Sequence, residues 1–419
     1  MKVPNEDLME SVLDPLNLEL AWKAVKGNRG SAGIDGISTD EFIEKFSPHR
    51  EVVLRKLRED KYKPSPVKRV YIPKEKNSKR ALGIPTVQDR VIQQAISQVI
   101  GEMFETRFSD HSYGFRPGRS SHDAVMAAQG YIAEGKDWVV DIDLKSFFDE
   151  VNHDLLMRKV SEVVHDKRVL HLIGKYLRSG VYEDGEVTAT RKGVPQGGPL
   201  SPLLSNIYLD MLDKELEKRG HCFCRYADDC NIYVGSEKSA RSVYASIVNW
   251  IHKHLKIPVN EDKSDIGRPW ERSFLGYIRT DTGKLKPSPK SLDKFMDKVR
   301  ECFNARKNGK SIDLRDYWKS YVRGWCNYYC LANAPYWRED LSRWTRRHMR
   351  KCFWQRWHKA KGRRRKLLKL GVPVYRLNCI NLWGSAWRCA KHPLMHMALN
   401  NKILVKYGFL TPSDFAPST

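Results

Sequence analysis

The run Trp138-Val139-Val140-Asp141-Ile142-Asp143-Leu144 constrains the fold more than any other part of this sequence. Its apolar residues predict a short strand that is buried inside a sheet. Burying an unpaired carboxylate costs several kcal/mol, so the two aspartates of this strand need a cationic partner or a metal ion. Side chains alternate with a period of two, so Asp141 and Asp143 share one face and the pattern does not choose between them.

A second acidic pair, Asp228-Asp229, lies in a tight turn between two short apolar strands predicted within residues 222–234. Acidic pairs are common in hairpin turns, so this pair alone is typical of turn chemistry. Together the two clusters offer the hard oxygen ligands that Mg²⁺ prefers. Two such ions about 3.5–4 Å apart stabilise the attacking and leaving oxygens in nucleotidyl transfer. The two clusters therefore suggest a metal-dependent site for that reaction.

The charge of the chain indicates a polyanionic partner. The formal net charge is +24, and residues 338–369 hold fourteen Lys or Arg against two acidic residues. Such a run favours binding of nucleic acid over a membrane surface, because no clean apolar face accompanies the charges. Eight of the twelve tryptophans lie beyond residue 300, where they either pack between helices or stack on bases.

The order of predicted elements is mixed α and β, followed by a helical end. We expect a helix near residues 16–26, a hairpin over residues 67–85, and a helix capped by Thr86. Another helix begins at Ser201-Pro202, with Ser201 as its cap, and ends at Gly220. After residue 287 the pattern is helical. The nine cysteines show no paired C-x2-C units, and no export signal or spanning apolar run is present, which predicts a cytoplasmic protein with free thiols.

Several motifs resemble those of reverse transcriptases encoded by group II introns. The hairpin Tyr226-Ala227-Asp228-Asp229 resembles the signature of these polymerases. The other matching stretches, in family order, are Ala32-Gly33-Ile34-Asp35-Gly36, Leu82-Gly83-Ile84-Pro85-Thr86, Tyr113-Gly114-Phe115-Arg116-Pro117, Asp141-Ile142-Asp143-Leu144-Lys145-Ser146-Phe147-Phe148-Asp149, Pro195-Gln196-Gly197-Gly198-Pro199-Leu200-Ser201-Pro202 and Phe274-Leu275-Gly276. The resemblance extends over roughly residues 15–400.

This resemblance implies an α+β right-hand polymerase fold, with fingers and palm followed by an all-α thumb. The implied domains are an N-terminal extension (1–45), fingers and palm (46–286), a thumb or maturase domain (287–378), and a short segment (379–419) similar to a DNA-binding domain. It also implies an RNA-directed DNA polymerase that binds its intron RNA and assists splicing. No histidine-rich or cysteine-rich endonuclease pattern follows, so the chain resembles the compact class without that domain.

The resemblance further assigns residues to the reaction. It gives Asp143, Asp228 and Asp229 as the catalytic carboxylates that hold two Mg²⁺ ions, and it prefers Asp143 to Asp141 because the aromatic residue facing the dNTP sugar follows at Phe148. The Phe147-Phe148 pair leaves one ring for the core. The other implied dNTP-binding residues are Lys74, Arg80, Gln196 and Lys263. On an arbitrary hairpin, Lys74 and Arg80 would simply be solvated charges.

The implied contacts to nucleic acid lie in the second half of the chain. Phe274, Leu275 and Gly276 resemble the hairpin that grips the primer. In the basic run, the candidate nucleic-acid ligands are Arg343, Arg346, Arg347, Arg350 and Lys351. The expected partners are intron RNA, an RNA template with a DNA primer, dNTPs and target DNA. The sequence does not decide between a monomer and a dimer, and a domesticated relative acting in defence or DNA repair is the alternative function.

Overall fold

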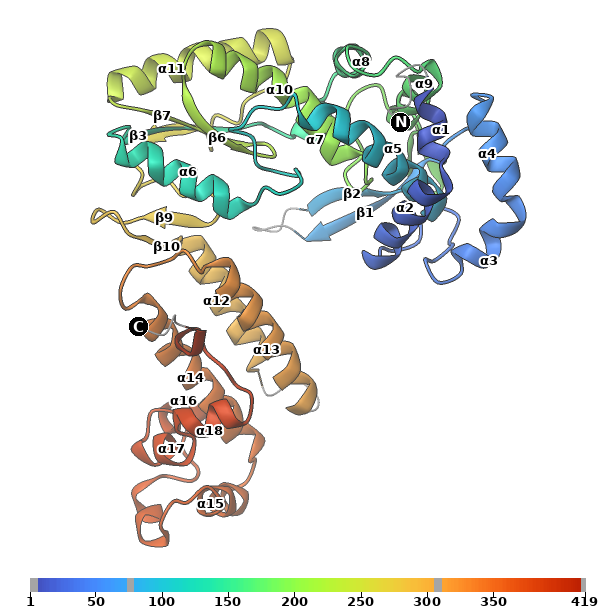
Figure 1. Ribbon diagram of the computed structural model, residues 1–419. Coiled ribbons are helices and arrows are strands. Elements are labelled where there is room, and N and C mark those ends of the chain that lie inside the picture. The colour runs from blue at the N-terminus through green and yellow to red at the C-terminus, as the bar shows by residue number, and fades with distance from the viewer. Residues whose placement is uncertain (1–6, 74–78, 305–310, 416–419) are drawn as a thin grey trace. The chain divides into compact units, whose positions relative to one another are not determined.

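The chain divides into two compact units, Met1–Arg268 and Pro269–Thr419, in a computed structural model that describes residues 7–73, 79–304 and 311–415 (Figure 1). The division falls before the expected boundary near residue 286. The reason is a hairpin, β9 (Tyr277–Arg279) and β10 (Leu285–Pro287), that bonds to the second unit: the Leu285 amide donates to Asn333, and its carbonyl accepts from Ala334. The four domain ranges given above stay predictions.

Helices form the first part of unit 1. They are α1 (Leu8–Leu13), α2 (Pro15–Gly27), α3 (Phe42–Phe46), the 3-10 turn η1 (Ser47–His49) and α4 (Arg50–Arg58). The predicted helix near residues 16–26 is confirmed by α2. Asp14 caps it by accepting from the amides of Leu16 and Asn17, and Pro15 occupies its first turn.

The two strands of the predicted hairpin that follows are confirmed and belong to a small sheet, while the connection at residues 74–78 lies outside the described residues. β1 (Val67–Pro73) pairs antiparallel with β2 (Lys79–Ile84) and parallel with β4 (Val181–Glu183), which pairs with β5 (Glu186–Thr188). Thr86 caps the next helix, α5 (Val87–Glu105), by accepting from the amide of Asp89 at 3.1 Å. This sheet contributes one side of a pocket described below.

The strand with two aspartates lies inside a second sheet, as the sequence predicts. The sheet order is β6-β7-β3-β8, with bounds β3 (Trp138–Asp143), β6 (Cys222–Tyr226), β7 (Asp229–Val234) and β8 (Asp265–Gly267). Val140 and Ile142 have no exposed surface. The helices α6 (Ser121–Ala133), α10 (Ser201–Lys218) and α11 (Glu237–Trp250) contact this sheet (Figure 1). The remaining elements of the unit are α7 (Phe147–Glu150), α8 (His153–Ser161), α9 (Lys167–Leu177) and the π-helix η2 (Ile251–Leu255).

The start of α10 corrects one detail of the sequence analysis. The helix begins at Ser201, but Ser201 is not its cap, because the residue at that position is Leu200. The Ser201 hydroxyl instead donates to the carbonyl of Pro195 at 2.6 Å. The side chain thus fastens the glycine-rich loop before the helix to its first turn.

Unit 2 is helical after β10. Its elements are α12 (Pro289–Cys302), α13 (Ser311–Tyr328), α14 (Trp337–Arg356), α15 (Ala360–Lys369), η3 (Val374–Cys379), α16 (Ala386–Cys389), α17 (Pro393–Ala398), α18 (Asn401–Lys406) and η4 (Pro412–Phe415). Trp318 and Trp354 are fully buried in its core, whereas Trp383 is 79% exposed. Packing between helices is therefore confirmed for Trp318 and Trp354, whereas stacking on bases by an exposed tryptophan such as Trp383 stays a prediction. Within the described segments, no helix is long and apolar enough to cross a bilayer.

Candidate active site

The acidic clusters meet at one end of the second sheet. Asp143 is the last residue of β3 and lies directly opposite Asp229, the first residue of β7. Opposed residues on antiparallel strands have Cβ atoms roughly 4.5–5.5 Å apart, so the two carboxylates are neighbours. Asp141 lies further along β3, opposite Asn231 and Asp265. The strand pairing thus brings Asp143, and not Asp141, to the acidic turn.

Backbone packing from a distant segment positions that turn. Ala227 adopts a left-handed backbone with φ of 57°, and Gly114 packs against it so closely that a Cβ on Gly114 would lie 2.4 Å from the Ala227 nitrogen. The neighbouring Tyr113 amide donates to the Arg225 carbonyl at 2.9 Å. The motif around Gly114 therefore supports the turn that carries Asp228 and Asp229.

Arg225 also supports the turn, and the sequence analysis missed it. It has no exposed surface; its guanidinium donates to both oxygens of the equally buried Asp213 of α10, at 2.7 and 2.5 Å. A further N–H donates to the Ala227 carbonyl at 2.9 Å. An arginine inside an apolar strand, just before an acidic turn, was the signal that could have identified it, because a buried charge requires a partner.

The charges at this end of the sheet interact strongly. Although Asp229 keeps exposed surface, local desolvation and the like charges of Asp228 and Asp143 raise the pKa of its carboxyl to about 6. The Lys263 Nζ lies 3.0 Å from Asp143 Oδ2 and opposes that rise. Lys263 is held there because the Asn260 amide donates to the Asp143 carbonyl and the Ser264 hydroxyl accepts from the Asp143 amide.

The donor chemistry of the three aspartates fits a divalent cation. In the described ranges, no group of three or more His, Cys, Asp or Glu side chains already converges as a metal site. The carboxylates nevertheless supply hard oxygens, and the repulsion that raises the pKa of Asp229 is what a bound cation would offset. Asp143, Asp228 and Asp229 are therefore the residues that could hold Mg²⁺.

A pocket of about 490 Å³ lies between the first sheet and the loop before α10. Phe148 and Gln196 line it, together with Gly83 of β2 and Arg69 of β1. Arg80 donates to the Gln196 side chain at 2.9 Å, so two of the residues predicted to bind the dNTP are in contact with each other. The loop lies against β2, where the Gly83 amide donates to the Gln196 carbonyl at 2.8 Å. Lys74, the partner proposed for Arg80, lies outside the described residues.

The two adjacent phenylalanines have different environments. Phe147 is 2% exposed and packs edge-on against Tyr208, so it is the core residue of the pair. Phe148 is half-buried and lines the pocket. Its carbonyl accepts from the Val194 amide at 2.6 Å. Gly193 precedes Val194 with φ of 90°, and a Cβ there would lie 2.9 Å from the Phe148 carbonyl oxygen. The backbone of residues 193 and 194 thus fixes the position of the Phe148 backbone, from which the ring extends.

The predicted primer grip is a tight turn in unit 2. Phe274 and Tyr277 form an antiparallel bridge across Leu275 and Gly276, which have φ of 50° and 78°. The Leu275 carbonyl accepts from the hydroxyl of Tyr328 at 2.7 Å, and the Gly276 carbonyl accepts from the Ser288 amide at 2.8 Å. The turn is therefore anchored on α13 and on the start of α12.

The basic helix α14 separates the predicted nucleic-acid ligands into two groups. Arg346 and Arg350 are buried, with 6% and 5% exposure; Arg346 donates to Glu339 and Thr411, and Arg350 to the Leu399 carbonyl. Their location corrects the expectation of a surface role for these two. Arg343 is exposed beside Asp340, while Arg347 and Lys351 are half-buried.

Comparison with known proteins identifies the family. The sequence model described as reverse transcriptase (RNA-dependent DNA polymerase) matches residues 72–279, and the model described as the group II intron, maturase-specific domain matches residues 292–371. Protein YkfC of Escherichia coli K12 is 30% identical over 62% of this chain and 78% of its own length. The group II intron-encoded protein LtrA of Lactococcus lactis subsp. cremoris is 28% identical over 78% of this chain and 70% of its own length. This chain belongs to the group II intron reverse transcriptase/maturase family.

As a member of this family, the chain is an RNA-directed DNA polymerase, and the predicted α+β right-hand fold is confirmed. Among solved structures, a chain of a partial Cas6-RT-Cas1–Cas2 complex is 25% identical, with a TM-score of 0.39. The match covers 59% of this chain and 43% of that chain. Unit 1 contains most of the reverse transcriptase match, and unit 2 contains all of the maturase match.

Proposed function

We propose that this protein copies RNA into DNA at the carboxylates Asp143, Asp228 and Asp229, with two Mg²⁺ ions as cofactors. The observation that carries the proposal is the pairing of Asp143 with Asp229 beside a turn held by Arg225. When bound, the ions would favour loss of the proton from the attacking 3′-hydroxyl and would stabilise the negative charge that develops on the leaving pyrophosphate. The protein's part is to hold three negative side chains close together on a rigid sheet, against their mutual repulsion.

The incoming dNTP would occupy the pocket beside Phe148. The half-buried ring would lie against the deoxyribose, where a 2′-hydroxyl would collide with it. Arg80 and Lys74 supply cationic donors for the triphosphate, and Gln196, held by Arg80, fixes the floor of the pocket. Lys263 has a 58% exposed side chain and would give its proton to the leaving pyrophosphate.

The primer strand and the RNA partners would be contacted by unit 2. Phe274, Leu275 and Gly276 would contact the primer strand through the anchored turn. Arg343, Arg347 and Lys351 would contact phosphates of intron RNA or of the template–primer duplex, because their side chains reach the surface of α14. We also propose that the protein binds target DNA and assists splicing of its intron, in keeping with the maturase-specific match.

Primer extension on an RNA template with Mg²⁺ tests the polymerase site. Asp228→Ala should lower the extension rate by roughly 100-fold or more, because it removes a metal ligand from the site. Asp40→Ala is the matched control, since Asp40 is an exposed aspartate far along the chain from the acidic turn. Equal activity of the two variants would refute the metal assignment.

A splicing assay separates the maturase role from polymerisation. The Asp228→Ala protein should still promote splicing of its intron RNA, because Asp228 belongs to unit 1, whereas α14 and the primer-grip turn belong to unit 2. Loss of both activities in a variant that melts at the wild-type temperature would contradict separate sites for the two roles.

A further inference from the structure

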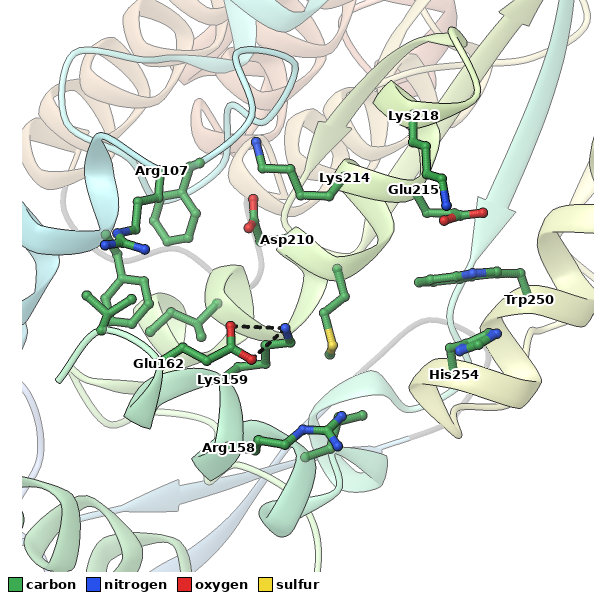
Figure 2. Close-up of a pocket in the computed structure, with 16 residues that line it drawn as sticks. Arg107, Arg158, Lys159, Glu162, Asp210, Lys214, Glu215, Lys218, Trp250 and His254 are labelled. Atoms are coloured by element: carbon green, nitrogen blue, oxygen red, sulfur yellow. Dashed lines mark hydrogen bonds and ion pairs between the residues drawn. The ribbon is translucent and has the colours of Figure 1, made fainter. Parts of the chain in front are cut away.

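A second pocket lies among the helices of unit 1, away from the residues assigned above. It has a volume of about 530 Å³, within the range of small-molecule sites. The end of α5 and the following turn, α8, α10 and the end of α11 with η2 form its walls (Figure 2). None of its lining residues belongs to the pocket beside Phe148 or to the catalytic carboxylates.

The inner wall of this helical pocket is apolar and aromatic. Its apolar lining residues are Phe104, Phe108, Leu155, Val163, Ile207, Met211 and Trp250. Trp250 is half-buried, and its ring stacks on His254 with centroids 4.9 Å apart and planes 23° apart. Figure 2 shows these two rings together at one end of the pocket. A flat apolar surface of this kind suits the face of a planar ring.

The rim of the pocket is positively charged. Arg107, Arg158 and Lys218 are exposed, and within the described segments none of the three has an ion-pair partner within 4.0 Å. Three other charged lining residues are paired: Lys159 with Glu162 at 2.8 Å, and Glu215 with Arg219 at 2.7 Å. The three unmatched cations come from different elements, so they surround the opening rather than forming one cluster.

Asp210 makes the centre of the pocket unsuitable for a bare anion. Its carboxyl lies in the middle of the view in Figure 2, and its Oδ1 is buried without a hydrogen-bond partner. Burial and the neighbouring Asp213 raise the pKa of this carboxyl to about 6. A ligand with a neutral flat centre and negative groups at its edge matches this distribution, whereas a phosphate ion inside would face Asp210.

We propose that the helical pocket binds an unpaired nucleotide of single-stranded RNA. The base would lie against Trp250 and the apolar wall, and Arg107, Arg158 and Lys218 would contact the phosphates on either side. Single-stranded nucleic acids are commonly bound by this combination of aromatic stacking and a cationic rim. A polymer fits better than a free nucleotide, because cations on three sides of the opening match several phosphates along a strand. The pocket would thus give unit 1 a contact to RNA separate from the polymerase site.

Binding of a 5′-labelled 12-nucleotide single-stranded RNA to the full-length protein, followed by fluorescence anisotropy, tests this proposal. Arg158→Glu and Lys218→Glu should each weaken binding roughly fivefold or more. Lys238→Glu is the matched control, because Lys238 is an exposed lysine of α11 outside the pocket and makes the same charge change as Lys218→Glu. The affinity for a blunt-ended RNA duplex should change by the same factor in the pocket variants and in the control variant, because the paired bases of a duplex cannot enter the pocket.

Trp250 provides a second test that does not depend on charge. Trp250→Phe should retain most of the affinity for the single-stranded RNA, and Trp250→Leu should lose it, with both melting temperatures measured to exclude misfolding. Primer extension with dNTPs should stay at the wild-type level in every variant, which keeps this proposal distinguishable from that for the polymerase site. Equal losses in Lys218→Glu and Lys238→Glu would overturn the proposal. If micromolar AMP changed the fluorescence of Trp250 while the variants kept their affinity for RNA, the pocket would be a site for free nucleotides. That result would also overturn the proposal.

Discussion

At the residue scale, neighbouring identical residues have different tasks because the backbone gives them different surroundings. Phe147 faces the core and Phe148 faces the pocket, although the sequence offers no way to rank them without the family resemblance. The same holds for Asp141 and Asp143, which share a face of β3. Only the pairing of β3 with β7 places Asp143 beside the acidic turn, and strand register is set by long-range contacts that local patterns do not contain.

Phe148→Val should admit ribonucleotides, because a smaller side chain leaves room for a 2′-hydroxyl. We expect discrimination between dNTPs and rNTPs to fall roughly tenfold or more, the effect of relieving a contact worth about 1.4 kcal/mol. Competitive primer extension with the two nucleotide classes measures this. Phe147→Val is the control: it should lower the free energy of unfolding by about 1–3 kcal/mol and leave discrimination unchanged.

Asp229→Asn should stabilise the metal-free protein more at pH 7.5 than at pH 4.5. The folded pKa of about 6 exceeds the unfolded value of roughly 3.9, so the folded chain keeps a proton that the unfolded chain loses between those values. Stability contributed by Asp229 therefore falls as the pH rises through that window, and the neutral amide avoids this loss. Thermal unfolding in EDTA at the two pH values measures the difference. Equal shifts at both would contradict a raised pKa.

At the element scale, the order and type of the main elements followed from the sequence, because apolar periodicity and caps are local signals. The hairpin β1–β2, the buried β3, the helix α2 and the helix α5 with its Thr86 cap were predicted correctly, whereas the Asp14 cap of α2 was not predicted. The cap of α10 was wrong because Ser201 finds a tertiary partner, the carbonyl of Pro195. Arg346 and Arg350 looked like surface cations, and only the packing of the segment around Leu399 and Thr411 against α14 buries them.

Breaking the ion pair between Arg225 and Asp213 should strongly destabilise unit 1. Asp213→Asn leaves a buried guanidinium without its charge partner, which typically costs about 3–5 kcal/mol. Urea unfolding measures the loss. Glu215→Gln, which disrupts the surface pair with Arg219 on the same helix, should cost about 1 kcal/mol or less. A small loss in Asp213→Asn would show that the pair does not hold α10 to β6.

At the scale of the whole molecule, the net charge of +24 indicated nucleic acid but not where it binds. The structure reduces the number of candidate nucleic-acid contacts, because Arg346 and Arg350 are buried. It also adds a helical pocket in unit 1, assembled from α5, α8, α10 and η2, whose residues are too scattered along the chain to form a recognisable motif.

Lys351 and Arg350 are adjacent but should respond differently to substitution. Lys351→Ala should weaken RNA binding and reduce the slope of log affinity against log salt by about 1, with an unchanged melting temperature, because one phosphate contact is lost. Arg350→Ala should lower the melting temperature instead, since its guanidinium donates to the buried Leu399 carbonyl. A salt slope that falls equally in both variants would contradict the buried assignment of Arg350.

The contact between Gly114 and the acidic turn limits how this polymerase can vary. Any side chain at Gly114 would enter the space occupied by the Ala227 nitrogen, and backbone atoms cannot rotate away as a flexible side chain can. In a library carrying every single substitution, selection for polymerisation should therefore deplete all variants of Gly114, a residue without functional groups, as severely as those of Asp228. Efforts to evolve a faster or more heat-resistant enzyme would then have to leave this glycine untouched and search the exposed faces of the surrounding helices.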